Sequence, residues 1–385
     1  HCSSGEFEYA KPVIKILKEK YPLHSILVTY FTTSYKSQIE KNPLVDFSQP
    51  LPWDLPGPIA SFLKQYKPQC LLLARSEIWP ELVHQVSSKK IPILIFSANK
   101  KQISPGEKFL YPLVKKTYSK INDVYCVSKE QISLYKTLGA PSVKEVGDTR
   151  YDQVIQKLHI PSPLVKTHSI QSNKKIFIAG STWKEDERVI QVPLVQLFKE
   201  KTLAPIIAPH EPSKQNLIRL KNFFEKQKVP VEFFSQISSW SGDSLLLIDQ
   251  IGVLASLYPY AHLAFVGGSF KKKVHSVMEP LAAGVPVLVG PYYQNSPEAC
   301  LFKKFFLNQR LCYISSFNTS QEFYNLVQTF FQEKQPCWKN SIQQEIQKRT
   351  GASLKVVQWV QHHLKEPPQE QALNPTHSKS SHLHE

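Results

Sequence analysis

A chain of 385 residues, 42% hydrophobic and 11% aromatic, can bury substantial cores, which excludes an intrinsically disordered protein. Its 47 lysines and arginines outnumber 31 acidic residues, and the resulting formal net charge of +16 indicates an anionic partner. No apolar run is long enough for a membrane span, no signal peptide is visible, and the six cysteines form no CxxC pair or zinc-type spacing.

The first part of the chain opens with a turn at Gly5 and Glu6 that predicts a helix, because apolar residues recur at helical spacing behind it. From position alone, Glu6 is a first-turn carboxylate favoured by the helix dipole. Helical stretches then alternate with strand-like apolar runs at residues 24–31, 69–74, 91–96 and 123–127. This alternation predicts a parallel sheet covered by helices, whose ligands bind at the carboxyl ends of the strands. One edge is therefore expected to gather the turns that hold Glu6, Thr32, Glu77 and Ser97.

The second part repeats this alternation after a polar stretch. Strand-like runs occur at residues 175–179, 204–208, 245–248, 263–266 and 285–289. We therefore predict two α/β domains, at residues 1–155 and 174–365, joined by a linker at 156–173. The polar residues 366–385 are predicted to be a disordered tail. The opening sequence HCSSGE reads as the end of a strand-to-helix turn, so the first domain is expected to begin before residue 1.

Residues 261–298 carry the clearest candidate for a binding site. The pattern predicts a strand, a loop at Gly267-Gly268-Ser269, a short helix at about 276–283 and a second strand. Glycines let the backbone approach a ligand, and Lys271, Lys272 and Lys273 can neutralise a phosphate. Glu279 is a carboxylate suited to a pair of ribose hydroxyls. The stretch indicates a site for a nucleotide-like anion, and the alternative is an ordinary turn with solvated lysines.

Short motifs spread over residues 1–300 add a resemblance. In chain order they are Gly5-Glu6, Pro52-Trp53-Asp54-Leu55-Pro56, Glu77-Ile78-Trp79-Pro80, Gly147 through Asp152, Gly180-Ser181-Thr182, Pro209-His210, Phe265 through Ser269, His275, Glu279-Pro280, Gly284-Val285-Pro286, Gly290-Pro291, Asn295 and Glu298. With these motifs the chain resembles the Kdo transferases, which move 3-deoxy-D-manno-octulosonic acid (Kdo) from CMP-Kdo onto a lipid A precursor.

The resemblance implies an α/β fold of two Rossmann-like domains facing across a cleft, as in GT-B type glycosyltransferases. It implies Glu6 as the general base, in place of the helix-dipole interpretation, and Glu77 is the rival catalytic carboxylate for that role. Implied donor-binding residues are Ser181, Thr182, His210, Gly252, Gly267, Gly268, Ser269, Lys273, His275, Glu279, Asn295 and Glu298. Implied acceptor-binding residues are Ser4, Gly5, Thr32, Thr33, Asp54 and Arg75. The chain departs from the family at Arg75, where a carboxylate is usual, and at Ser276, where an asparagine is usual.

The implied reaction is an inverting transfer to lipid IVA in lipopolysaccharide core biosynthesis, with CMP-Kdo as donor and no metal or other cofactor. Implied partners are the lipid A precursor and an anionic membrane surface, with no obligate protein partner, at the cytoplasmic face of the bacterial inner membrane. The N-terminal anchor typical of the family is expected to be missing from this chain. Dispersed basic residues disfavour nucleic acid. The alternatives are another nucleotide-sugar glycosyltransferase or an epimerase on the same scaffold, and a non-catalytic homologue that binds lipid.

Overall fold

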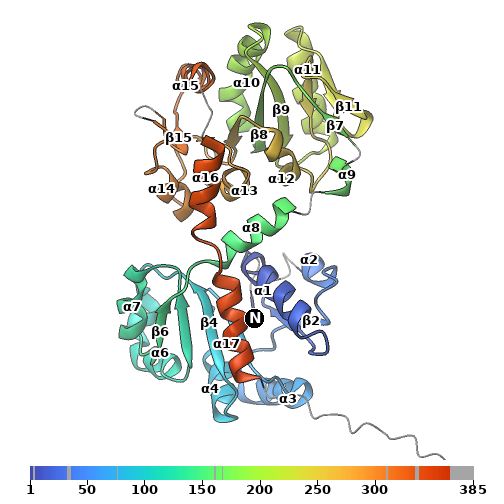
Figure 1. The fold of residues 1–385 in the computed structure, drawn as a ribbon. Helices are drawn as coiled ribbons and strands as arrows, with labels where there is room; N and C mark the ends of the chain where they lie inside the picture. The colour runs from blue at the N-terminus through green and yellow to red at the C-terminus, as the bar shows by residue number, and fades with distance from the viewer. Residues whose placement is uncertain are drawn as a thin grey trace, which may run out of the picture. The chain divides into compact units, whose positions relative to one another are not determined.

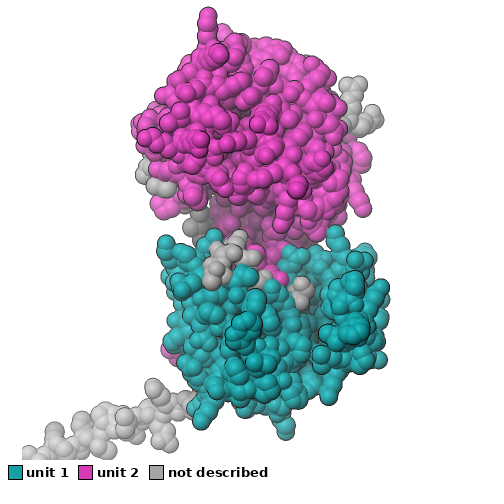
Figure 2. Space-filling view, turned by 180° about the vertical axis from the view of Figure 1, so that it is seen from behind, with its two compact units in different colours: residues 1–4, 25–145, 354–385 teal, residues 5–24, 146–353 magenta. Residues whose placement is uncertain are grey.

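The chain forms two compact units in the computed structural model, which describes residues 1–2, 5–32, 36–75, 77–159, 162–166, 168–308, 311–333 and 338–364. Unit 1 comprises residues 1–4, 25–145 and 354–385, and unit 2 comprises residues 5–24 and 146–353 (Figures 1 and 2). The chain therefore passes from one unit to the other at residues 4–5, 24–25, 145–146 and 353–354.

Unit 1 is built on a parallel sheet of order β3-β4-β5-β6, with strands Leu71–Ala74, Ile93–Ala98, Asp123–Cys126 and Val143–Glu145. A separate parallel pair joins β1 (Leu27–Tyr30) to β2 (Phe47–Pro50). Every residue of β4 is buried, as expected for a central parallel strand with both faces covered. The helices of this unit are α2 (Lys36–Glu40), α3 (Pro56–Tyr66), α4 (Pro80–Ser88), α5 (Pro105–Phe109), α6 (Tyr111–Tyr118), α7 (Ile132–Thr137) and most of α17 (Ala352–His363).

Unit 2 contains a seven-stranded parallel sheet of order β10-β12-β9-β8-β13-β14-β15, in which β8 and β9 lie side by side (Figure 1). In that order the strands span Val231–Phe233, Leu245–Leu247, Leu203–Pro209, Lys175–Thr182, Leu263–Val266, Val287–Val289 and Ile314–Ser316. The helices are α1 (Phe7–Lys20), α8 (Thr149–His159), α9 (Pro163–Lys166), α10 (Lys184–Lys199), α11 (Lys214–Lys226), α12 (Leu254–Leu257), α13 (Met278–Ala282), α14 (Pro297–Phe302), α15 (Ser320–Gln332) and α16 (Trp338–Gln347). A short pair, β7 (Ser169–Ile170) with β11 (Ser239–Trp240), completes the unit.

Both faces of the unit 2 sheet are apolar, because successive side chains of a strand point to opposite sides. Phe177 and Ala179 of β8 pack into a core with α10, α11 and α15. Their neighbours Ile176 and Ile178 pack into a second core that includes Leu257 of α12. The uninterrupted apolar runs in the sequence thus correspond to strands covered by helices on both sides.

The predicted division of the chain differs from the observed one. The expected linker at 156–173 contains the end of α8, α9 and β7, and the units divide at residues 145–146 instead. The stretch is polar and yet structured, because its few apolar residues, such as Val165 of α9 and Ile170 of β7, are buried in the core of unit 2. The predicted tail at 366–385 lies outside the described residues. Among the described helices, none is both long and apolar enough to cross a membrane.

Candidate functional site

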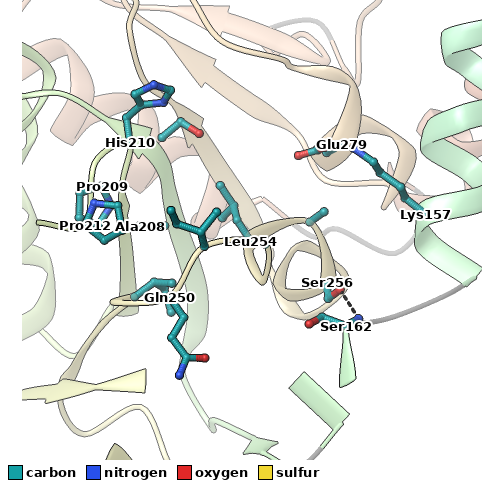
Figure 3. A pocket seen from close by; sticks show the side chains of 15 residues that line it. Lys157, Ser162, Ala208, Pro209, His210, Pro212, Gln250, Leu254, Ser256 and Glu279 are labelled. Carbon is teal, nitrogen blue, oxygen red and sulfur yellow. Dashed lines mark hydrogen bonds and ion pairs between the residues drawn. The ribbon is translucent and has the colours of Figure 1, made fainter. Parts of the chain in front are cut away.

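A cavity of about 500 Å³ opens at the carboxyl ends of β8, β9 and β12 in unit 2 (Figure 3). This is the edge at which parallel α/β sheets bind their ligands. Four of the residues singled out for donor binding line the cavity, namely Ser181, His210, Gly252 and Glu279. His210 lies on one side of the cavity, and Glu279 lies on another beside Lys157 (Figure 3).

Glu279 is held at the cavity wall by Lys157, whose Nζ lies 3.2 Å from Glu279 Oε1. The same Nζ lies 3.5 Å from Oε2 of Glu8, which is on α1. Burial acts to lower the pKa of Lys157, but the two carboxylates outweigh it and raise that pKa above its ordinary value. The cavity therefore presents one carboxylate and one ammonium group side by side.

The glycine loop after β13 is packed against the chain itself. A Cβ on Gly267 would come within 2.3 Å of the Ser181 carbonyl oxygen, and one on Gly268, where φ is +83°, within 2.2 Å of the Lys273 carbonyl oxygen. The amides of Gly268 and Phe270 donate to the buried carboxylate of Asp186 at 2.7 and 3.0 Å. Burial raises the pKa of Asp186, although these hydrogen bonds oppose the rise. The anion bound by these two loop amides is thus the protein's own Asp186.

Beside this loop, three aromatic rings form a stack. The His210 ring lies 4.6 Å from the Trp183 ring and 4.3 Å from the His275 ring, measured between centroids. Trp183 Nε1 donates to His275 Nε2 at 2.8 Å, and Lys271 Nζ lies 3.4 Å above the Trp183 ring. Burial, reinforced by the nearby His210, lowers the pKa of His275 to about 4, so this imidazole is neutral at pH 7. With Nε2 accepting, the proton of the neutral ring is on Nδ1.

Other residues of the donor set form hydrogen bonds or ion pairs with groups of the chain itself. Thr182 Oγ1 donates to Glu187 at 2.9 Å, and Ser269 Oγ accepts the Gly290 amide at 2.7 Å. The Asn295 side chain bonds both backbone groups of Val274, and Glu298 lies 3.5 Å from Arg150. These four groups shape the loops around the cavity. Lys273 is exposed on the glycine loop.

The candidate acceptor residues of unit 1 follow the carboxyl ends of its strands. Thr32 is exposed just beyond β1. Asp54 accepts the amides of Glu81 and Leu82 at 3.0 and 2.9 Å, so its carboxylate caps α4. Arg75, just beyond β3, has a left-handed backbone with φ +65°, as does Ser97 of β4 with φ +50°. Non-glycine residues in this conformation often cluster at functional sites.

Glu77 Oε2 lies 3.2 Å from Nε2 of His1, which also accepts the indole N–H of Trp79 at 2.9 Å. Glu6 belongs to unit 2, where it precedes α1 and its carbonyl oxygen accepts the Tyr9 amide. Gly5 is exposed in the turn before it. Ser4 and Thr33 lie outside the described residues.

The chain is similar to known proteins over most of its length. Residues 1–153 match the family model described as 3-deoxy-D-manno-octulosonic-acid transferase (kdotransferase). A curated protein of that name from Haemophilus influenzae is 29% identical over 315 residues, covering 77% of this chain and 71% of the relative. One from Aquifex aeolicus is 28% identical over 295 residues, covering 76% and 74%. Over most of its length the chain is therefore similar to the Kdo transferases.

The chain also resembles solved structures in its fold. A solved UDP-GlcNAc 2-epimerase from Methanocaldococcus jannaschii superposes with a TM-score of 0.59 over 94% of this chain and 98% of the other, at 15% identity. At that identity the likeness concerns the fold alone. The predicted class of two Rossmann-like α/β domains is confirmed.

Three residues of this Kdo transferase homologue that shape the site were missed from the sequence. They are Lys157, Trp183 and Asp186, which contact Glu279, His275 and the Gly268 amide. Trp183 directly follows the Gly180-Ser181-Thr182 motif, and Asp186 falls in the first turn of α10, which were usable signals. Nothing in the sequence near Lys157 pointed to Glu279, because the two are 122 positions apart.

Proposed function

We propose that this chain is a glycosyltransferase that moves Kdo from CMP-Kdo onto a lipid A precursor in lipopolysaccharide biosynthesis. The observation that carries the proposal is the similarity over 77% of the chain to a protein named as a Kdo transferase. The cavity at the carboxyl edge of the unit 2 sheet supports it, because Ser181, His210 and Glu279 of the family motifs line that cavity.

The cavity supplies groups suited to a CMP-sugar. The Glu279 carboxylate can accept hydrogen bonds from the two ribose hydroxyls, and the His210 ring can stack on a base or a sugar face. The leaving CMP carries negative phosphate oxygens, which the exposed Lys273 can stabilise. The proposal thus assigns charge neutralisation to side chains, with no metal and no other cofactor.

Glu6 is the proposed general base. As the acceptor hydroxyl oxygen bonds to the anomeric carbon of Kdo, its proton passes to the Glu6 carboxylate, and the bond from that carbon to the phosphate oxygen breaks. A single displacement of this kind inverts the anomeric centre. Glu77 is the rival carboxylate, and its position after β3 makes it the alternative base in unit 1.

The proposed acceptor is a lipid, so the reaction belongs at a membrane surface. We place the protein peripherally at the cytoplasmic face of the inner membrane, where its net charge of +16 favours anionic lipids.

Release of CMP from CMP-Kdo, measured with and without a tetraacylated lipid A precursor, tests the proposal. Acceptor-dependent release together with a heavier lipid product is expected. The absence of CMP release from CMP-Kdo, both with and without the acceptor, would overturn the proposal. A parallel incubation with UDP-GlcNAc, followed for 2-epimerisation, tests the epimerase alternative.

A further inference from the structure

Helix α8 bonds on one side to α1 and on the other to the elements around the donor cavity, all within unit 2. Arg150, Gln153 and Lys157 share one helical face, since they are three and four residues apart. Gln153 Nε2 donates to Glu8 Oε2 at 2.5 Å, and Lys157 Nζ contacts the same carboxylate at 3.5 Å. Lys157 then reaches Glu279 of the cavity at 3.2 Å.

Arg150, nearer the start of α8, also links α1 to the residues around the donor cavity. Arg150 Nη1 donates to the Tyr9 hydroxyl at 3.4 Å, and the guanidinium lies 5.4 Å from the centre of the Tyr9 ring. Its Nη2 donates to Ser276 Oγ at 3.1 Å, and its Nη1 lies 3.5 Å from Glu298. Arg150 therefore contacts Tyr9 of α1 and also Ser276 and Glu298, which lie in the stretch that carries the donor-binding motifs.

These groups are shielded enough for their charges to matter. The side chains of Glu8 and Glu279 are 22% and 25% exposed, and that of Glu298 is 13% exposed. Burial acts to raise the pKa of Glu8, but Lys157 and Lys11 outweigh it and lower that pKa. A network of half-buried ion pairs holds its members in one arrangement more firmly than separate surface pairs do.

We propose that Lys157 and Arg150 are positioning residues that couple the donor cavity to helix α1. This rests on the proposed function, because α1 begins directly after Glu6, the proposed base. A donor that engages Glu279 stiffens the Glu279–Lys157–Glu8 chain and so fixes the start of α1. The base is then in place when the donor is bound, which limits deprotonation to the productive complex.

Glu8 provides the cleanest variant, because it does not line the cavity. Glu8→Gln removes the charge that pairs with Lys157 but keeps an oxygen that can accept from Gln153. Glu19→Gln is the matched control on the same helix: its carboxylate lies 4.0 Å from Lys15 and is 62% exposed.

Hydrogen exchange on the 385-residue protein tests the coupling. Without ligand, Glu8→Gln is expected to speed exchange of residues 276–283 severalfold, and Glu19→Gln to leave it unchanged. With saturating CMP, exchange of residues 7–20 is expected to slow in the unaltered protein and in Glu19→Gln but not in Glu8→Gln. Calorimetry on the same samples reports CMP binding itself.

These measurements distinguish a failure of the coupling from a failure of the proposed donor site. If CMP binds and α1 exchange does not respond, the coupling is overturned while the donor assignment stands. If CMP does not bind, the donor assignment fails, and the unliganded comparison alone decides the coupling. Equal exchange at 276–283 in both variants then overturns it.

Turnover gives a readout that a purely structural role does not move. Glu8→Gln is expected to lower kcat by roughly 10-fold while the KM for CMP-Kdo stays within about twofold. Lys157→Arg keeps a charge that can reach both carboxylates and should retain turnover, whereas Lys157→Met should lose it. A rise in KM with unchanged kcat in Glu8→Gln, or equal losses in both Lys157 variants, contradicts the proposal.

Discussion

Glu6 and Glu77 are the two carboxylates that compete for the role of general base. Glu6→Gln keeps the size and hydrogen bonding of the side chain but removes its proton affinity, so turnover should fall by roughly 10²–10⁴-fold. The affinity for CMP should hardly change, because Glu6 does not line the cavity. Steady-state CMP release checks this, with Glu77→Gln as the control. Near-normal turnover in Glu6→Gln, with turnover abolished in a folded Glu77→Gln, would exchange the roles.

Glu279 is the cavity residue whose removal should affect donor binding most directly. Glu279→Ala is expected to weaken CMP binding by about 1–3 kcal/mol, since buried ribose hydroxyls lose their acceptor. Calorimetry with CMP measures this change. An unaltered affinity would exclude Glu279 from the donor site.

His275 gives the site a pH-dependent contribution to stability. Its pKa of about 4 in the folded chain lies below the ordinary value of 6.5, so the unfolded chain binds the proton more readily. The contribution is complete above pH 6.5, is lost as the pH falls from 6.5 to 4, and is constant below that. Urea unfolding at pH 7 and pH 4.5 should therefore show a loss of stability that is smaller in His275→Gln. An equal loss of stability in both proteins would contradict the lowered pKa of His275.

The sequence located some site residues and missed the partners that hold them. Glu279 stood out because it lies in a predicted helix that follows a strand and a glycine loop. The use of the Gly268 amide could not be foreseen, because its acceptor Asp186 is 82 positions away. Glycines at 267 and 268 predicted room for a ligand, whereas the nearest neighbour of each is a backbone carbonyl oxygen of this chain.

Among the elements, α4 depends on a cap supplied from a distant loop. Its own N-cap residue, Trp79, makes no side-chain cap, and Asp54 accepts the first free amides instead. Asp54→Ala should cost about 1–2 kcal/mol of unfolding free energy, and Asp54→Asn, which keeps one acceptor oxygen, clearly less. Urea unfolding measures both. Equal stability in all three proteins would leave Asp54 free for the predicted acceptor role.

Strands were predictable where they are fully buried and missed where they are partly exposed. The run at 263–266 matches β13 in full, because all four residues are buried. β2, β6 and β10 were missed, since they are three or four residues long and mostly exposed or half-buried. A short strand with little apolar surface gives no periodic signal, and only its neighbours in the sheet define it.

At the scale of the whole molecule, the net charge of +16 predicts binding to anionic lipid. Sedimentation with anionic vesicles should show binding that weakens with salt, each engaged lysine contributing about 1 kcal/mol. We expect the lysines of α1 and of the loop after β4 to meet the lipid. Of these, Lys11, Lys15 and Lys100 have carboxylate partners, and Lys18 donates to the His24 carbonyl. Lys101 forms no ion pair with any described residue, so Lys101→Glu should weaken binding more than Lys15→Glu. Salt-independent binding to neutral vesicles would contradict the prediction.

The predicted domain limits failed for a reason that lies outside any local pattern. Composition and periodicity detect where a segment changes character, and residues 156–173 do become polar. They do not detect that α1 packs against α8, or that Trp359 of α17 donates to Asp123 at 2.8 Å. Contacts between the ends and the middle of the chain decide which unit those helices join.

The four crossings between units have a consequence for how the protein is made. Residues 5–24 leave the ribosome well before α8, against which α1 packs, because unit 1 residues 25–145 are synthesised in between. Unit 1 in turn waits for α17, whose Trp359 bonds Asp123, near the end of the chain. Neither unit can complete its folding during translation until most of the polypeptide has emerged, so the nascent chain carries an unpartnered amphipathic α1 for more than 120 residues.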